Sequence, residues 1–282
     1  IENIKNNFSL LSMDIQTKIQ LKSELRQKRL MLHQFQLIKQ LFKTIQSLLD
    51  DSTGASVRTS VLERCCRDWV QAYVAMELLK NHNNNNTIAT SITTSTLYKK
   101  LSGSMYESKE KILKHLDMVF LSECIPKNYF SEEYHSINTT RLSPILRAYT
   151  ILSMEEHVYD IYASNVISPF LIEILTKSRL DGGVRNSFSG LDSLYNEILS
   201  FILIKCSCII ELVKTTSPTI ELLTNSIFKT VVDELVSKFP SIFSPGIARM
   251  FHKNYVSSQR LLHYSTTTIY RYINTKTVYY LA

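Results

Sequence analysis

The chain has 282 residues, of which 44% are hydrophobic, enough apolar material for one long domain or two ordinary ones. It contains only 6 Gly and 6 Pro. β-Sandwiches and nucleotide-binding α/β folds need more of both residues for their turns and phosphate loops. The composition therefore argues against those classes and favours long helices joined by short connectors.

The net charge of +7 is concentrated at the two ends of the chain. Residues 1–49 contain 8 Lys or Arg against 3 Asp or Glu, and residues 241–282 contain 5 Lys or Arg and no acidic residue. Basic ends can meet anionic lipid, nucleic acid or an acidic partner. No dense basic block occurs, so we interpret most of these charges as solvated helix faces. Tyrosines interleave with basic residues in 249–282, which keeps a nucleic-acid-associated helical adaptor as the alternative.

The first 49 residues contain no Gly or Pro and predict one or two long helices. An apolar set spaced four and three residues apart opens this region: Ile4, Phe8, Leu11 and Ile15. The pattern slips between Lys18 and Lys28 and then resumes with the same spacing: Met31, Phe35, Ile38, Phe42, Ile45 and Leu49. This spacing is typical of a coiled-coil seam.

Four leucines form a second stripe beside the seam: Leu30, Leu37, Leu41 and Leu48. Two stripes on one helix indicate more than one neighbour. We therefore expect the seam from Met31 to Leu49 to bind another protein subunit. The alternative is that this helix packs only onto its own chain.

Helical patterns continue along the chain in six further stretches: 57–80, 106–124, 143–163, 165–178, 191–215 and 218–239. Pro144 and Pro218 suit opening turns, and Pro169 is expected to start or kink its helix. The most hydrophobic stretch, 198–213, is short for a bilayer and contains Lys205 and Glu211, so it predicts a buried core helix.

The run from Asn81 to Thr96 is rich in Asn, Ser and Thr and predicts a disordered insertion. We expect an all-α chain in three segments: a coiled-coil helix at 1–50, an irregular antiparallel helical bundle or rod at 51–263, and a divergent tail at 264–282. Residues 266–273 in that tail alternate as a strand would. The chain begins with Ile1 and shows no signal-peptide pattern, so we expect its natural N-terminus to lie upstream.

The sequence contains no phosphate-loop, zinc-protease or nucleophile-elbow pattern. Two short acid/histidine clusters, 132–135 and 155–157, are interpreted as solvated helix faces, because adjacent residues on a helix point to different sides. The cysteines match neither a zinc site nor a disulfide motif, and we expect inert, reduced thiols: Cys65, Cys66, Cys124, Cys206 and Cys208. We predict no enzyme, no cofactor, and no catalytic, cofactor-binding or metal-binding residue.

One segment carries a family resemblance. Phe239-Pro240-Ser241-Ile242-Phe243-Ser244-Pro245-Gly246 is followed by Phe251-His252-Lys253-Asn254-Tyr255. This string is similar to the middle of the subunit-two family of the conserved oligomeric Golgi complex. Stretches that resemble the same family occur upstream in the same order: Leu146–Ile151, Val166–Ile174 and Leu194–Leu199. The resemblance covers about 20–263 and fails beyond Leu262.

This resemblance implies a scaffold subunit of a vesicle-tethering complex that acts in intra-Golgi retrograde transport and Golgi organisation. It implies a cytosolic protein held peripherally on the cytoplasmic face of the Golgi membrane. The implied partners are other subunits of the complex, especially the third and fourth, contacted through N-terminal helices, with no nucleic acid and no small-molecule substrate. The family's N-terminal start and C-terminal helical domain are absent, so a fragment is implied. The aromatic residues around the Pro-Gly turn are expected to hold two helices together: Phe239, Phe243, Phe251 and Tyr255.

The insertion generates a direct prediction. Limited proteolysis should cut within 81–96 before it cuts the flanking helices, because exposed polar segments are the preferred sites of nicking. The two fragments should stay associated on size-exclusion chromatography. First cuts inside 57–80 or 106–124 would contradict the proposed organisation.

Overall fold

The computed structural model describes residues 2–50, 59–81, 96–176 and 191–238, together with Val256, Gln259 and His263. In these ranges the chain forms helices joined by turns and has no β-strand, so the all-α prediction is confirmed. Most of the 81–96 insertion, the four aromatic residues near the Pro-Gly turn and the 264–282 tail lie outside the described residues. The three-segment organisation stays a prediction.

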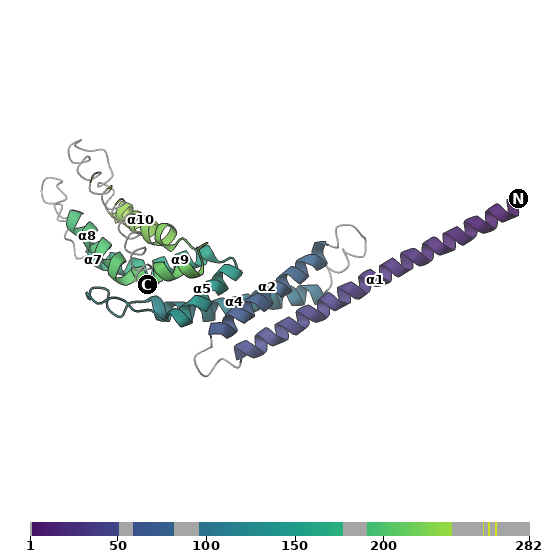
Figure 1. Cartoon of the computed structure of the whole chain (residues 1–282), viewed down its shortest axis with the longest axis horizontal. Helices are drawn as coiled ribbons and strands as arrows, with labels where there is room; N and C mark the ends of the chain where they lie inside the picture. The colour runs from purple at the N-terminus through teal and green to yellow at the C-terminus, as the bar shows by residue number, and fades with distance from the viewer. Residues whose placement is uncertain are drawn as a thin grey trace, which may run out of the picture. The chain divides into compact units, whose positions relative to one another are not determined.

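The chain divides into two compact units, Ile1–Leu113 and Lys114–Ala282, and the boundary falls inside helix α4 (Thr96–Cys124). Unit 1 pairs α1 (Glu2–Asp50) with α2 (Thr59–Asn81), which lies beside the C-terminal half of α1 (Figure 1). The two helices are antiparallel, because Leu30 and Met31 share a small apolar cavity with Leu78 and Leu79. Residues 2–50 thus form one helix.

The buried side chains of α2 recur at spacings of three and four residues: Leu62, Cys65, Trp69, Ala72, Met76 and Leu79. Besides its contact with α1, α2 contacts the first part of α4 through Trp69. The indole Nε1 donates to the carbonyl of Met105 at 3.0 Å, and Lys109 Nζ lies 5.3 Å from the ring centre. These contacts explain why α4 begins ten residues before the predicted 106, although Gly103 in a helix interior costs about 1 kcal/mol relative to Ala.

Unit 2 contains the rest of α4 and the helices that follow it. Their bounds are α5 (Thr139–Ile151), α6 (Glu155–Tyr162), η1 (Ala163–Ile167), α7 (Ser168–Thr176), α8 (Leu191–Phe201), η2 (Ile202–Cys206), α9 (Ser207–Thr216), η3 (Leu223–Phe228) and α10 (Lys229–Lys238). The η segments are π-helices that continue the neighbouring α-helices. The four stretches of this unit predicted to be helical, 143–163, 165–178, 191–215 and 218–239, are mostly helical, with corrected boundaries.

The predicted helix 143–163 is two helices. α5 starts earlier, at Thr139, because the Asn138 side chain caps it by accepting from the Arg141 amide. The break after Ile151 contains Ser153, whose φ is 52°. Because α5 starts earlier than predicted, Pro144 lies inside this helix rather than in its first turn.

Pro218 does not lie in the opening turn of a helix either. It lies in a turn in which the Ile220 amide donates to the Ser217 carbonyl at 2.9 Å.

Pro169 is the second residue of α7, as expected of a proline that starts or kinks its helix, and the π-helix η1 joins α7 to α6 without a break. Proline has no N–H, so Pro169 cannot supply the α-helical bond to the carbonyl of Asn165, four residues earlier. That carbonyl accepts from the Tyr129 hydroxyl at 3.1 Å. A neighbouring segment thus satisfies a carbonyl that the proline leaves without its usual donor.

Aromatic rings fill the centre of unit 2. Phe120 packs edge-on against Tyr149 at 5.9 Å and against Tyr162 at 6.3 Å between ring centroids. The Tyr149 hydroxyl donates to Asp117 Oδ1 at 2.6 Å, and His157 Nε2 lies 3.1 Å from the same oxygen. α4, α5 and α6 therefore meet at one carboxylate.

The hydrophobic stretch 198–213 is a buried core helix, as predicted: Ile198, Ile202, Ile209 and Val213 are each at most 2% exposed. By length and composition, one helical stretch of the described residues, Glu155–Leu175, could cross a membrane. Half of its apolar window is buried inside the structure, and Tyr162 in it packs on Phe120. This burial is typical of a core helix.

The Asp117 junction generates a stability prediction. Tyr149→Phe keeps the ring and removes the hydroxyl that donates to the carboxylate, so the free energy of unfolding should fall by about 1.5–3 kcal/mol, the range for hydrogen bonds to charged groups. Urea denaturation measures the change. Tyr73→Phe is the matched control at a 47% exposed ring and should stay within about 0.5 kcal/mol. Equal effects of the two variants would contradict a role for the Asp117 bond.

Candidate partner-binding surface on helix α1

The structure divides the predicted seam between the interior of unit 1 and its surface. Ile38 and Ile45 are fully buried, and Phe42 and Leu49 are at most 9% exposed. Met31 and Phe35 are half-buried. α2 is the helix that lies along this part of α1 (Figure 1). Another subunit could reach the four buried residues only if α2 moved away, so partner binding by the whole seam stays a prediction.

The N-terminal half of α1 differs, because its large apolar side chains are exposed. Phe8 is 75% exposed, Leu11 60%, Ile15 51% and Ile19 64%. We call these four residues the N-terminal apolar face. Six more large apolar residues of α1 are at least 58% exposed: Leu10, Met13, Leu21, Leu25, Leu30 and Leu32. Contiguous exposed apolar surface of this kind marks interaction sites in monomeric proteins.

The N-terminal apolar face points away from the α2 side of the helix. A helix turns by about 100° per residue, which places the four residues roughly 100° to 180° around the axis from Ile38. The slip in the apolar spacing between 18 and 28 produces this rotation. Between residues 16 and 27, the α2-facing side carries polar residues such as Gln20 and Gln27. A partner on the N-terminal apolar face would therefore approach from a different side than α2.

The N-terminal half of α1 is also positively charged. Residues 8–30 contain five Lys or Arg and two acidic residues. Asp14 is paired with Lys18, the Nζ–Oδ2 distance being 2.6 Å. The remaining basic side chains favour a partner with acidic residues beside its apolar stripe, since complementary charge speeds encounter and fixes register.

Most side chains of the two predicted acid/histidine clusters are exposed, as expected for solvated faces, but both histidines are half-buried and have structural contacts. His157 pairs with Asp117 on α4 rather than with its neighbours Glu155 and Glu156. His135 lies in the connector between α4 and α5, where its Nε2 is 2.8 Å from the Glu123 carbonyl. Periodicity could not reveal partners that are 40 and 12 residues away. Among the described residues, no group of three metal-ligating side chains converges.

Burial lowers the reactivity of four cysteine thiols. Desolvation raises the pKa of Cys65 to about 11 and that of Cys206 to about 12. It also raises the pKa of Cys66 and Cys124. Because the thiolate is the reactive form, these four thiols are poor nucleophiles at neutral pH.

No protein-family model matches the chain, and no solved structure gives a significant match. "Conserved oligomeric Golgi complex subunit 2" of Arabidopsis thaliana is 28% identical over 138 residues, which are 48% of this chain and 18% of that protein. The Homo sapiens protein of the same name is 26% identical over 121 residues, 40% of this chain and 16% of that protein. The chain resembles part of subunit 2.

The resemblance indicated by the ordered stretches of sequence is thus confirmed. The matches span less than a fifth of the length of these relatives. The names of both relatives describe a subunit of a multi-protein complex. An exposed apolar helix face is the feature of this structure that fits such a role.

The buried part of the seam generates the next prediction. Ile38→Asp combined with Ile45→Asp should unfold unit 1, because each substitution buries a carboxylate without a partner and lowers the free energy of unfolding by several kcal/mol. Circular dichroism and size-exclusion chromatography report the loss of helix or aggregation. Gln40→Asp with Gln46→Asp adds the same charge at exposed positions of α1 and should leave both measurements unchanged. A soluble, fully helical Ile38/Ile45 variant would contradict the packing on α2.

Proposed function

We propose that the chain is a scaffold subunit of a Golgi vesicle-tethering complex, acting through helix-mediated protein contacts in intra-Golgi retrograde transport and Golgi organisation. The similarity to two proteins named subunit 2 of the conserved oligomeric Golgi complex supports this proposal. The observation that carries it is the N-terminal apolar face of α1. On this face Phe8, Leu11 and Ile15 are each more than half exposed. Exposure of so much apolar surface to water is unfavourable and is typical of a protein-binding site.

The proposed partners are other subunits of the complex, especially the third and fourth. An amphipathic helix from one of them would lie along the N-terminal apolar face, in the helix-to-helix mode that heptad spacing supports. Its own apolar residues would cover the side chains of Leu11 and Ile15. Acidic residues at the edges of its stripe would face the basic side chains of α1.

The proposed location is the cytoplasmic face of the Golgi membrane, with the chain held peripherally through the complex. We also propose that the chain catalyses no reaction. High thiol pKa values at Cys65 and Cys206 support this part, as does the use of His157 in the packing of three helices. The nucleic-acid alternative has no support from the similar proteins, and the 249–282 residues that suggested it lie almost entirely outside the described structure.

The proposal predicts a selective loss of binding. Leu11→Asp with Ile15→Asp should weaken co-purification with the third and fourth subunits by about 100-fold or more, because burying each aliphatic side chain contributes about 1.5–3 kcal/mol. Helix content and thermal unfolding of the isolated chain should not change, since both residues are exposed there. Pull-down with purified subunits, followed by titration, measures the effect.

Gln16→Asp with Gln20→Asp is the matched control, because it adds the same charge to exposed residues on another side of the same helix turns. This control should retain at least most of the affinity. The proposal is wrong if the Leu11/Ile15 variant binds as the unmodified chain does. Equal loss in both variants would show that added negative charge, rather than the apolar face, controls binding.

A further inference from the structure

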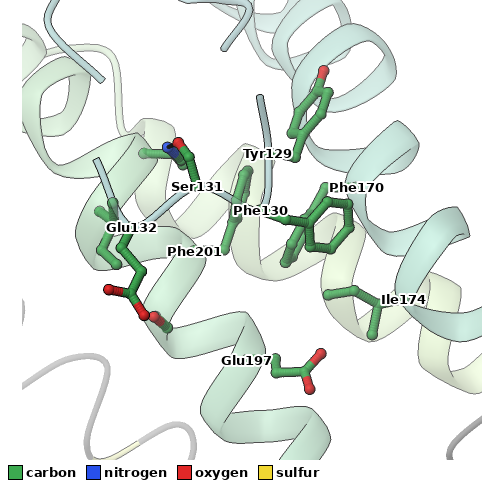
Figure 2. Close-up of a pocket in the computed structure, with 11 residues that line it drawn as sticks. Tyr129, Phe130, Ser131, Glu132, Phe170, Ile174, Glu197 and Phe201 are labelled. Atoms are coloured by element: carbon green, nitrogen blue, oxygen red, sulfur yellow. Dashed lines mark hydrogen bonds between the residues drawn. The ribbon is translucent and has the colours of Figure 1, made fainter. Parts of the chain in front are cut away.

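Unit 2 contains a second candidate site, a pocket of about 310 Å³ between the α4–α5 connector, α7 and the continuous α8–η2 helix (Figure 2). Aromatic rings form one wall. Phe170 and Phe201 stack with ring centroids 3.7 Å apart, and Phe130 lies 5.8 Å from Phe170. Phe130 is 47% exposed, so an apolar face of this wall is accessible from solvent.

Two carboxylates accompany the aromatic wall. Glu132 comes from the connector and Glu197 from α8, and Figure 2 shows their side chains at the edge of the same opening, with Ile174 across from Glu132. The Lys205 ammonium also belongs to the lining, but it donates to Ser131 Oγ at 2.7 Å and to the Glu133 carbonyl at 2.6 Å. Both acceptors are neutral, so the ammonium keeps its charge; the two carboxylates outnumber it, and the lining has a formal charge of −1 in a chain of net charge +7.

The connector that forms one side of the pocket is fastened at several points. The Tyr129 hydroxyl donates to the Asn165 carbonyl in η1 at 3.1 Å, and the His135 amide donates to the Ile204 carbonyl in η2 at 3.2 Å. Lys205 of η2 supplies the bonds to Ser131 and Glu133. π-Helical segments are rare and occur frequently at functional sites. A wall held in this way needs little reorganisation to accept a ligand.

We propose that this pocket binds the side chain of an arginine presented by another polypeptide. A guanidinium is planar, forms paired hydrogen bonds with carboxylates and stacks on aromatic faces. Phe130 is the solvent-accessible ring of the wall, so the guanidinium would stack on this ring rather than on Phe170 or Phe201. The pocket volume is at the lower end of the range for ligand sites, which begins near 300 Å³, and so suits one side chain better than a large cofactor.

Other cations fit these features less well. A lysine ammonium is compact and strongly hydrated, and it lacks the planar face that stacks on a ring. The quaternary ammonium of a choline headgroup binds aromatic surfaces but has no N–H to donate to Glu132 and Glu197. The carboxylates therefore favour arginine on a protein over a lipid headgroup. This inference does not depend on the proposed tethering function, because it concerns a different unit and a different surface.

The test uses the whole chain with ¹³C-labelled isoleucine methyl groups and N-acetyl-arginine amide as the probe. Saturable shifts are expected at Ile174 and Ile204, which both line the pocket. N-acetyl-citrulline amide, which has nearly the same shape without the charge, should bind about tenfold more weakly or worse, because charge-assisted hydrogen bonds are the stronger ones. Equal binding of the two probes would overturn the proposal.

Glu132→Gln with Glu197→Gln removes both carboxylates and preserves side-chain size. This variant should bind the arginine probe about tenfold more weakly than the unmodified chain, or weaker still. Glu211→Gln with Glu221→Gln makes the same change in charge at positions outside the pocket lining and should leave the affinity within about twofold. Isoleucine methyl spectra without the probe verify that both variants fold. No shift at Ile174 and Ile204, equal affinity in all chains, or tighter binding of phosphocholine micelles than of the arginine probe would each overturn the proposal.

Discussion

The contact between α1 and α2 is the constraint on which the rest of unit 1 depends. It buries Ile38, Phe42, Ile45 and Leu49, and each buried side chain of this size contributes about 1.5–3 kcal/mol. α2 has only 23 residues against 49 in α1, so it is long enough to cover slightly less than half of the longer helix. The part of α1 beyond α2 is held as helix by propagation from the anchored half, which costs less than starting a helix anew.

That difference in length turns one helix into two functional regions. The C-terminal half uses its apolar side within the chain, and the N-terminal half presents Phe8, Leu11 and Ile15 to solvent. A continuous heptad pattern would have aligned both regions on one side. The slip between residues 18 and 28 rotates the exposed face by well over a quarter turn from the α2 side. A partner can therefore occupy the exposed face while α2 keeps its place.

Unit 2 depends on a different kind of interaction, polar bonds between segments far apart in sequence. Asp117 joins α4 to α5 and α6 through Tyr149 and His157. The connector after α4 is bound to carbonyls of two π-helical segments, at Asn165 and Ile204. These bonds fix backbone that would otherwise be a free loop, and they give the aromatic pocket a defined wall.

Much of the helical architecture could be predicted from the sequence, because apolar spacing and the scarcity of Gly and Pro are local signals. The long helix Glu2–Asp50 and the buried stretch at 198–213 are examples. The spacing of Ile38 and Ile45 showed that they share a face, but it could not show that α2 covers them. Likewise, no local signal connects His157 to Asp117, or Lys205 to Ser131, since each pair is at least 40 residues apart.

Some local signals were misleading. Pro218 was expected in the opening turn of a helix, but it lies in a turn before that helix. Pro169 was expected to start or kink its helix and is the second residue of α7, where Tyr129 bonds the carbonyl of Asn165. α4 begins ten residues before the predicted 106 and passes through Gly103, because Trp69 holds the neighbouring turns. Tertiary contacts outweighed residue preference at these positions.

Hydrogen exchange along α1, measured by mass spectrometry on the chain alone and on the complex with the third and fourth subunits, tests the division of this helix most directly. In the chain alone, amides at 38–49 should exchange slowly and those at 8–20 rapidly, because a helical segment without packing is marginal in water. In the complex, protection should extend to 8–20 and change little at 38–49. Uniform protection of α1 in the chain alone, or no gain at 8–20 in the complex, would contradict the account.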